Sequence, residues 1–402
     1  MRIAVTSISR RKLGGAEEYL ARILPSLQDQ GHAIGFLYES DGSPTASLIP
    51  LAAGTPTWSV ETLGRAEAVR ALREWAPDVV YCNGLSNVNL EAAISRVAPS
   101  VFSAHGYWGT CISGAKSHLL PTPRPCDRTL GPGCLLRYYP RRCGGLNPLT
   151  MVKDYAAQSR RLEILRTFDA VVVHSDHMAR EYAKHGIRAD IVSLPLGVGT
   201  PCSAQARAAR RWRACFIGRM TALKGVASML DALRLAQPRL AVPMHLTLAG
   251  DGPERARSEI LAHKITATLP NLTFEFTGWI QEARRAELLS MQDLLIVPSV
   301  WPEPFGMVGL EAAAYGVPAV AFDVGGIPEW LHDGSNGLLA AAAPPSAAGL
   351  ADAIVRALRD EAVHRRLGAG ARAAYESFAR RNPGAELLSV LERVARLARP
   401  EP

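Results

Sequence analysis

The feature that most constrains this fold is a repeated alternation of short apolar runs with segments of helical periodicity. The first run, residues 3–6, is followed by Gly14-Gly15 and then by apolar residues at helical spacing. Gly31 predicts the end of this helix, and residues 33–38 form the next apolar run. A strand, a helix and a strand in this order predict a parallel sheet with right-handed crossovers.

The same alternation occurs in both halves of the chain. Between the halves, residues 200–213 are polar and basic and predict an interdomain linker. The pattern therefore predicts an α/β protein of two Rossmann-like parallel-sheet domains, residues 1–200 and 201–382. Because such sheets bind ligands beyond the carboxyl ends of their strands, we expect a site in the cleft between the domains. The further predicted strands lie at residues 78–81, 100–104, 170–173, 214–217, 244–249, 272–276, 294–297 and 318–322.

Composition and charge exclude several classes of protein. No apolar stretch approaches the length of a transmembrane helix, and the N-terminus lacks an apolar signal core, so we expect a cytoplasmic protein. The net charge of +8 favours anionic partners. Aromatic residues, at 6%, are too sparse for a protein that stacks nucleic-acid bases, and we expect no nucleic-acid partner. Most of the net charge lies in residues 116–166, which contain ten basic and three acidic residues.

Residues 298–316 carry the most informative motif. They follow an apolar run and open a helix, and Gly306 permits a close approach of the backbone at its start. The backbone amides of residues 305–308 would then point out of a helix N-terminus, which favours an anion. Glu303 lies just before this helix and Glu311 about one turn inside it. Two carboxylates beside an anion site suit a phosphate with the hydroxyl groups of a sugar on either side.

The spacing Glu-Pro-Phe-Gly-x4-Glu from Glu303 to Glu311 resembles the signature of retaining nucleotide-sugar glycosyltransferases with the GT-B fold, specifically glycosyltransferase family 4. Other elements agree with this family in order and spacing. The similar segments are residues 14–15, 104–108, 218–225, 248–253, 325–329 and 336–337. The resemblance covers nearly the whole chain.

The resemblance implies an enzyme that moves a hexose-type sugar from a nucleoside diphosphate sugar to an acceptor hydroxyl, with retention of configuration. It implies that Arg219 and Lys224 hold the donor pyrophosphate, that Glu303 and His105 bind the donor sugar, and that Glu311 binds the ribose. The residues implied to be catalytic are His105, Arg219, Lys224 and Glu303. Those implied to bind the donor are Gly14, Gly15, Gly218, Gly278, Trp279, Pro298, Phe305, Gly306, Met307, Val308 and Glu311.

The resemblance also implies that catalysis requires no metal ion and no cofactor, because Arg219, Lys224 and helix amides neutralise the phosphates. It leaves the donor open between a UDP-, a GDP- and an ADP-sugar, and the acceptor open between a glycan, a lipid-linked and a small molecule. Residues 383–402 are expected to form a helix that crosses back to the first domain. Such an enzyme would act in glycan or glycoconjugate biosynthesis.

Other interpretations stay open at this point. The same fold fits a nucleotide-sugar epimerase, a phosphorylase-like enzyme or a non-catalytic nucleotide-sugar-binding module. A dinucleotide oxidoreductase is disfavoured, because no complete Gly-x-Gly-x-x-Gly follows the first strand. Singly, Glu303 could be a helix-end carboxylate, Gly14-Gly15 a tight turn, and His105 a structural histidine.

Four cysteines lie in an insert at about residues 109–148. Their spacing, Cys-x14-Cys-x7-Cys-x8-Cys, is not the paired Cys-x2-Cys of a zinc finger. One hypothesis is a structural zinc ion held by four thiolates, and the alternatives are reduced thiols or a disulfide. The four residues are Cys111, Cys126, Cys134 and Cys143.

The basic segment at residues 116–166 also has two interpretations. It could contact an anionic membrane or a phosphorylated acceptor, which would place the protein peripherally at the inner face of a membrane. Alternatively, it could be a solvated loop and a helix whose arginines extend along the surface.

Overall fold

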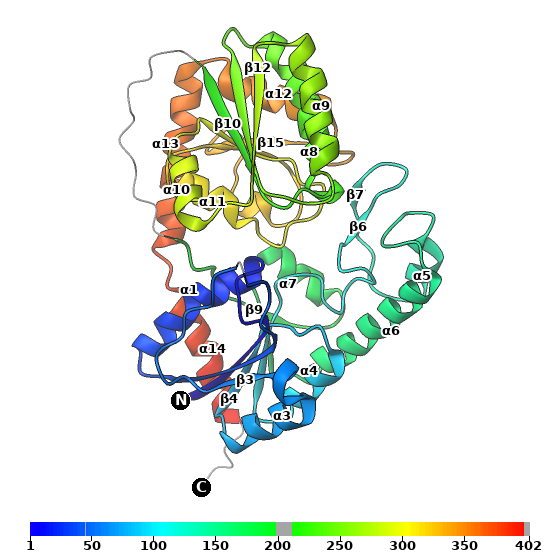
Figure 1. Ribbon diagram of the computed structural model, residues 1–402, viewed down its shortest axis with the longest axis vertical. Helices are drawn as coiled ribbons and strands as arrows, with labels where there is room; N and C mark the ends of the chain where they lie inside the picture. The colour runs from blue at the N-terminus through cyan, green and yellow to red at the C-terminus, as the bar shows by residue number, and fades with distance from the viewer. Residues whose placement is uncertain (45, 198–210, 398–402) are drawn as a thin grey trace. The chain divides into compact units, whose positions relative to one another are not determined.

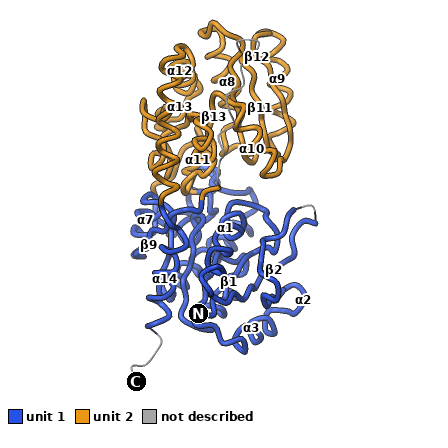
Figure 2. The backbone as a smooth tube through the Cα atoms, turned by 90° about the vertical axis from the view of Figure 1, so that its left-hand side faces the viewer, with its two compact units in different colours: residues 1–115, 128–195, 381–402 blue, residues 116–127, 196–380 orange. Residues whose placement is uncertain are grey.

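The computed structural model describes residues 1–44, 46–197 and 211–397. It contains two compact units, drawn in blue and orange in Figure 2. Unit 1 comprises Met1–Ala115, Arg128–Pro195 and Arg381–Pro402, and unit 2 comprises Lys116–Asp127 and Leu196–Arg380. The chain thus leaves unit 1, builds most of unit 2, and returns to unit 1 at its C-terminal end.

Unit 1 is built on a seven-stranded parallel sheet in the order β3-β2-β1-β4-β5-β8-β9. The central strands are almost wholly buried apolar runs, as expected for a sheet covered on both faces. The strands are β1 (Arg2–Ser9), β2 (Ala33–Ser40), β3 (Thr57–Ser59), β4 (Val79–Cys82), β5 (Ser100–Ser103), β8 (Ala170–Val173) and β9 (Ala189–Ile191). The helices are α1 (Gly15–Asp29), α2 (Val60–Leu63), α3 (Arg65–Glu74), α4 (Val88–Ile94), α5 (Gly133–Tyr138), α6 (Pro148–Leu165), α7 (Asp176–Ala183) and α14 (Pro383–Leu397).

Helix α14 belongs to the core of unit 1. Its apolar residues Leu387 and Leu391 are fully buried in one cluster with Leu20 and Leu24 of α1. Its Glu386 carboxylate accepts hydrogen bonds from both the backbone amide (2.7 Å) and the hydroxyl (3.1 Å) of Ser193. The last helix therefore closes the apolar core that α1 begins.

Unit 2 is built on a six-stranded parallel sheet in the order β12-β11-β10-β13-β14-β15. It also contains a short antiparallel hairpin, β6 (Ser117–His118) with β7 (Arg124–Pro125). The strands are β10 (Trp212–Ile217), β11 (Met244–Ala249), β12 (Leu272–Gly278), β13 (Leu294–Val297), β14 (Ala319–Phe322) and β15 (Gly337–Ala340). The helices are α8 (Val226–Ala236), α9 (Arg255–Thr268), α10 (Glu282–Ser290), α11 (Met307–Ala313), α12 (Ala347–Leu358) and α13 (Glu361–Ala379), with 3-10 turns η1 (Ala222–Lys224), η2 (Gln237–Arg239) and η3 (Ile327–Glu329).

Two parallel α/β sheets confirm the predicted fold class. The strands that the sequence did not predict, including β3, β9 and β15, are short or lie at sheet edges, where the apolar run is brief. Of the predicted linker at 200–213, residues 200–210 lie outside the described residues, whereas Trp212 and Arg213 already belong to β10. Among the described residues, no helix has the length and apolar character needed to cross a membrane.

Candidate functional site

The carboxylate of Glu303 is the most closely held group of the predicted site. Glu303 lies in the loop between β13 and α11 and is 6% exposed. Its Oε1 atom is 2.6 Å from Nζ of Lys224 and accepts a hydrogen bond from the hydroxyl of Ser299 at 2.5 Å. Its Oε2 atom makes no hydrogen bond to a described residue. One oxygen is thus held by two protein groups, and the other is held by none that the structure describes.

Lys224 reaches Glu303 because the strands that precede both residues are neighbours. Lys224 ends η1, which follows β10, and β10 pairs with β13. Backbone hydrogen bonds tie the two loops together, since the amides of Val300 (3.0 Å) and Trp301 (3.1 Å) both donate to the carbonyl of Leu223. The Lys224 ammonium also lies 4.9 Å from the centre of the Trp301 ring, a cation–π contact.

Two glycines of the predicted motifs allow these loops to meet. Gly225 has φ +70°, and a Cβ atom there would lie 2.0 Å from the carbonyl oxygen of Pro298. Gly325 has φ +61°, and a Cβ atom there would lie 2.3 Å from the carbonyl oxygen of Glu303. The amide of Gly326 donates to that carbonyl at 2.7 Å. Both positions require a backbone that only glycine adopts readily, and both fix the loop that carries Glu303.

The turn after Glu303 has the predicted form. Gly306 takes a left-handed conformation (φ 91°), and α11 begins at Met307, although it is only seven residues long. The fully buried Trp330 donates a hydrogen bond from Nε1 to the carbonyl of Phe305 at 2.7 Å. Glu311 lies in α11 with Oε2 3.6 Å from Nε of Arg285 in α10. The sequence did not point to Arg285, because this partner comes from a separate helix.

The other predicted residues of unit 2 follow strands of the same sheet. Arg219 comes two residues after β10, is exposed, and makes no ion pair or hydrogen bond through its side chain to a described residue. Gly278 ends β12 with φ +72°, and Trp279 follows it with 69% exposure. Gly218 directly follows β10, and Pro298 directly follows β13. All these residues lie at the carboxyl ends of parallel strands, where α/β sheets bind ligands.

In unit 1, His105 follows β5 and contacts residues that follow two neighbouring strands, β4 and β8. Its Nε2 donates to Oδ1 of Asn83 at 3.0 Å and lies 3.1 Å from the hydroxyl of Ser103. Its ring centre is 4.9 Å from those of Tyr19 and His174. Burial and the neighbouring His174 hold the pKa of His105 well below its usual range, so the ring is neutral at pH 7.

Sequence reasoning missed the residues that position His105. Asn83 follows β4 and His174 follows β8, so each stands after a buried strand, which is the one signal that could have identified them. His174 donates from Nδ1 to the carbonyl of Val192 at 2.9 Å, and burial lowers its pKa to about 4. Gly14 and Gly15 stand where predicted, Gly14 as the N-cap of α1 and Gly15 as its first residue.

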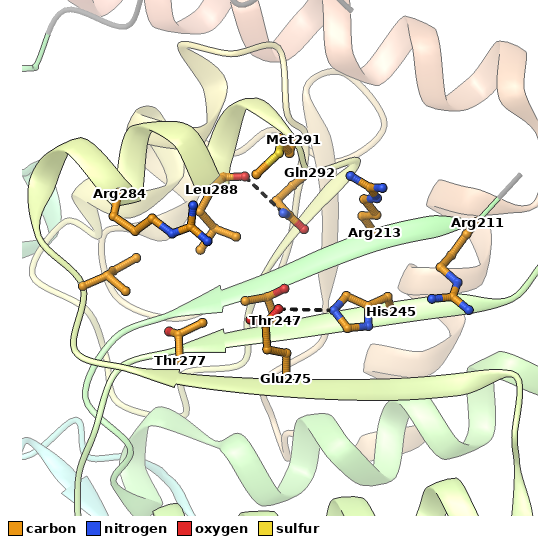
Figure 3. A pocket seen from close by; sticks show the side chains of 11 residues that line it. Arg211, Arg213, His245, Thr247, Glu275, Thr277, Arg284, Leu288, Met291 and Gln292 are labelled. Atoms are coloured by element: carbon orange, nitrogen blue, oxygen red, sulfur yellow. Dashed lines mark hydrogen bonds and ion pairs between the residues drawn. The ribbon is translucent and has the colours of Figure 1, made fainter. Parts of the chain in front are cut away.

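A separate cavity of about 300 Å³ lies on one face of the unit 2 sheet. Figure 3 shows it between strands β10 to β12 and helix α10, with Arg213 and His245 on the strands and Gln292 just beyond the helix. The Gln292 amide donates to the carbonyl of Leu288 at 3.1 Å, and His245 Nε2 lies 3.5 Å from Glu275 Oε2. None of the residues predicted for the donor site lines this cavity.

The four clustered cysteines are not gathered into one group of ligands in the part of the chain that the structure describes. No group of three or more cysteine, histidine or acidic side chains that could hold a metal ion occurs among the described residues, which include all four. Cys111 is buried, whereas Cys134 in α5 and Cys143 after it lie with their sulfur atoms 3.7 Å and 3.8 Å from backbone carbonyls of their own segment. The zinc hypothesis and its alternatives stay predictions.

Comparisons with known proteins identify the family to which the chain is similar. Residues 13–200 match the family model Glycosyltransferase Family 4, and residues 203–374 match Glycosyl transferases group 1. The N-acetyl-alpha-D-glucosaminyl L-malate synthase of Bacillus anthracis is 39% identical over 142 residues, 34% of this chain and 34% of that protein. The alpha-maltose-1-phosphate synthase of Mycobacterium tuberculosis is 27% identical over 318 residues, 71% of this chain and 76% of that protein. The matched region thus spans about a third of the first relative and about three quarters of the second.

Solved structures show the same architecture over the whole chain. The structure of Anabaena HepE in complex with UDP and glucose matches with a TM-score of 0.67 at 21% identity, covering 98% of this chain and 99% of that one. Sucrose-phosphate synthase from Thermosynechococcus elongatus matches with a TM-score of 0.67 at 20% identity, covering 98% of both chains. At these identities the likeness shows the fold alone. Together the two family models cover every motif noted above, and the chain belongs to the glycosyltransferases with the GT-B fold.

Proposed function

We propose that this glycosyltransferase moves a hexose-type sugar from a nucleoside diphosphate sugar to an acceptor hydroxyl with retention of configuration. The observation that carries the proposal is the contact of Lys224 and Ser299 with one oxygen of Glu303. It brings a cation and a carboxylate together at the carboxyl ends of β10 and β13, where a diphosphate and a sugar would bind side by side.

The cations of this site suit the leaving group of the reaction. When the bond between the sugar and the diphosphate breaks, negative charge develops on the departing phosphate oxygen. Arg219 offers a guanidinium with no partner among the described residues, which matches the forked geometry of phosphate oxygens. Lys224 adds a compact charge held in place by Glu303 and Trp301. The Lys224 charge is held in place before the reaction and therefore stabilises the transition state with little reorganisation.

Glu303 acts in this proposal as a sugar-binding group and not as a nucleophile. Its Oε1 is occupied by Lys224 and Ser299, so one oxygen remains to accept a hydrogen bond from a donor-sugar hydroxyl. With no carboxylate assigned to attack the sugar, the acceptor hydroxyl attacks from the face that the diphosphate leaves. The acceptor oxygen forms the new bond to the sugar, the bond to phosphate breaks, and the departing phosphate oxygen takes the acceptor proton. Configuration is thereby retained.

The nature of the acceptor is proposed from the relatives. The phosphatidyl-myo-inositol mannosyltransferase of Mycobacterium tuberculosis is 29% identical over 227 residues, 54% of this chain and 58% of that protein, and its name specifies a lipid acceptor. A lipid-linked or glycan acceptor also agrees with the basic character of residues 116–166 in this chain. We propose Glu311 for the ribose and His105 for the donor sugar, as the family resemblance implies.

A thermal-shift series tests the donor site. We expect one of UDP, GDP, ADP and dTDP to raise the melting temperature of the full chain, because a ligand that binds only the folded state stabilises it. Arg219→Ala should lose most of this shift and of sugar transfer, since it removes a charge-assisted contact to phosphate. The matched control is Arg365→Ala, another exposed arginine of unit 2 without an ion pair to a described residue.

The outcomes of this series separate the proposal from its alternatives. If Arg219→Ala kept the thermal shift and the turnover of the wild type, the assignment of Arg219 to the donor pyrophosphate would be wrong. A radiolabelled donor that yields an epimerised nucleotide sugar, or a sugar phosphate, instead of a glycosylated acceptor would contradict the proposed reaction. A product of inverted configuration would contradict retention alone.

A further inference from the structure

Exposed apolar side chains gather over α5 and the first turns of α6 in unit 1. Leu136, Leu146, Leu149 and Val152 are between 56% and 81% exposed, and Leu136 is the most exposed large apolar residue that the structure describes. They lie within 17 positions of the chain, on two helices that pack against each other and on the loop that joins them (Figure 1). A group of this kind on a surface marks a contact with another body.

Basic residues without an ion pair to a described residue lie in the same segment as these apolar residues. Arg137, Arg141, Arg142 and Lys153 form no side-chain ion pair with any described residue, and residues 133–153 contain no acidic side chain. The exposed Arg70 of α3, by contrast, is paired with Glu67 and Glu74. The four apolar and four basic residues together are called the α5–α6 patch: Leu136, Arg137, Arg141, Arg142, Leu146, Leu149, Val152 and Lys153.

The start of α6 presents both kinds of side chain on one face. Leu149, Val152 and Lys153 stand at positions i, i+3 and i+4 and are all exposed. The helix begins at Pro148 with the side chain of Asn147 as its N-cap. Apolar side chains at this spacing with a basic residue beside them are typical of a helix that lies in a lipid interface.

The far end of α6 is anchored in unit 1. Arg161 is 2% exposed, and its Nε donates to Oε1 of the fully buried Glu91 in α4 at 3.1 Å. Its guanidinium also stacks 4.4 Å from the centre of the Trp108 ring. In Figure 1, α6 extends from this anchor towards α5, so the patch stands on a rigid support.

We propose that the α5–α6 patch docks unit 1 onto an anionic lipid surface. A uniformly negative surface satisfies four cations that form no ion pair with a described residue, and the acyl boundary accepts the leucine side chains while the arginines remain among the headgroups. A protein partner would need acidic groups placed to match four separate cations. The patch includes none of the residues assigned to the donor, and the proposal does not depend on the proposed function.

Vesicle flotation with the full chain tests the proposal. The probes are vesicles of phosphatidylcholine alone and vesicles of phosphatidylcholine mixed with phosphatidylglycerol. We expect the chain to float with the mixed vesicles and much less with the neutral ones, and we expect raised salt to weaken but not abolish binding, because salt screens only the charges. The double variant Arg137→Gln/Arg142→Gln should bind roughly 25-fold more weakly, since each cation near such a surface contributes about five-fold.

Matched controls separate the patch from general surface effects. Arg365→Gln/Arg366→Gln removes two exposed, unpaired arginines of α13, and Ile260→Glu changes an exposed apolar residue of α9 that is 59% exposed. Both should bind vesicles as the wild type does, whereas Leu149→Glu should lose binding by more than about ten-fold. All these side chains are exposed, so we expect each variant to fold as the wild type does. The melting temperature of each variant checks this.

Three results would overturn the proposal. Equal binding to neutral and anionic vesicles would show that the basic residues do not contribute to the contact. Binding by Leu149→Glu at the level of the wild type would show that the apolar residues do not contribute. The third is a dimer, detected by light scattering, that Leu149→Glu dissociates while wild-type protein fails to float. That result would assign the patch to a second copy of the chain.

Discussion

At the scale of single residues, the surroundings of His105 fix its tautomer as well as its position. Asn83 accepts a hydrogen bond from Nε2, which leaves Nδ1 of the neutral ring as an acceptor without a partner among the described residues. A donor-sugar hydroxyl can donate to that atom. Asn83 is thus a positioning residue in our proposal, and its buried Nδ2 atom has no hydrogen-bond partner.

The paired histidines predict that the protein loses stability in mild acid. Burial lowers the pKa of His174 to about 4 and also lowers that of His105, so both bind protons more readily in the unfolded chain. The two neutral histidines make their full contribution to the free energy of unfolding above about pH 6.5. This contribution is lost as the pH falls towards their pKa values in the folded protein. His174→Gln should therefore reduce the loss of unfolding free energy between about pH 6.5 and 4 by up to about 3 kcal/mol.

Urea unfolding at several pH values measures this effect. The control is His263→Gln, which changes an exposed histidine of α9 and should leave the pH dependence as in the wild type. An unchanged pH slope in His174→Gln would show that His174 does not titrate differently in the folded and unfolded states.

At the scale of elements, the loops of unit 2 are held by backbone packing as much as by side chains. The turn at Gly225 begins α8 and contacts the loop after β13. This contact places Lys224, directly before it, beside Glu303. The placement of Lys224 beside Glu303 therefore depends on where two loops meet, and not on the ion pair alone.

Substitution of Gly225 should damage both stability and donor binding. Gly225→Ala combines a left-handed conformation with a clash against the carbonyl of Pro298, and we expect a loss of more than about 2 kcal/mol. Gly334→Ala is a matched control, because Gly334 has a similar φ of +74° but no atom within 4 Å of the added Cβ. It should lose only about 1 kcal/mol, the usual cost of the left-handed conformation.

Calorimetry and the nucleotide-induced thermal shift measure the two effects. If Gly225→Ala and Gly334→Ala lowered the melting temperature equally, the contact with Pro298 would contribute nothing. A Gly225→Ala protein that kept the full nucleotide shift would show that the position of Lys224 does not depend on this turn.

At the scale of the whole molecule, the interior of each sheet was predictable, and the edges and long-range contacts were not. β11 and β13 were predicted at their observed bounds because a strand covered on both faces is a continuous apolar run. The motif residues were predicted from their spacing after such runs and from the family resemblance, and their roles stay predictions. Asn83, His174 and Arg285 were missed because their neighbours are distant in sequence, 22 residues separating Asn83 from His105.

The return of the chain to unit 1 predicts that α14 stabilises that unit. Leu391→Ala removes a fully buried side chain from the cluster it shares with α1, and we expect a loss of about 2–5 kcal/mol. Leu397→Ala in the same helix is the control, because Leu397 is 68% exposed and should change stability little. Calorimetry of both variants checks this, and equal melting temperatures would show that α14 contributes no core.

Because the chain re-enters unit 1 only at its C-terminal end, the core of unit 1 is completed late during synthesis of the protein. A ribosome releases residues 1–195 long before it makes α14, and the chain of unit 2 is synthesised in between. Throughout that interval Leu20 and Leu24 of α1 lack the apolar surface that later covers them, which is a condition that favours aggregation and chaperone binding. The nascent chain of this enzyme therefore completes its first-made unit last, and a ribosome that stalls within unit 2 leaves an unfinished core.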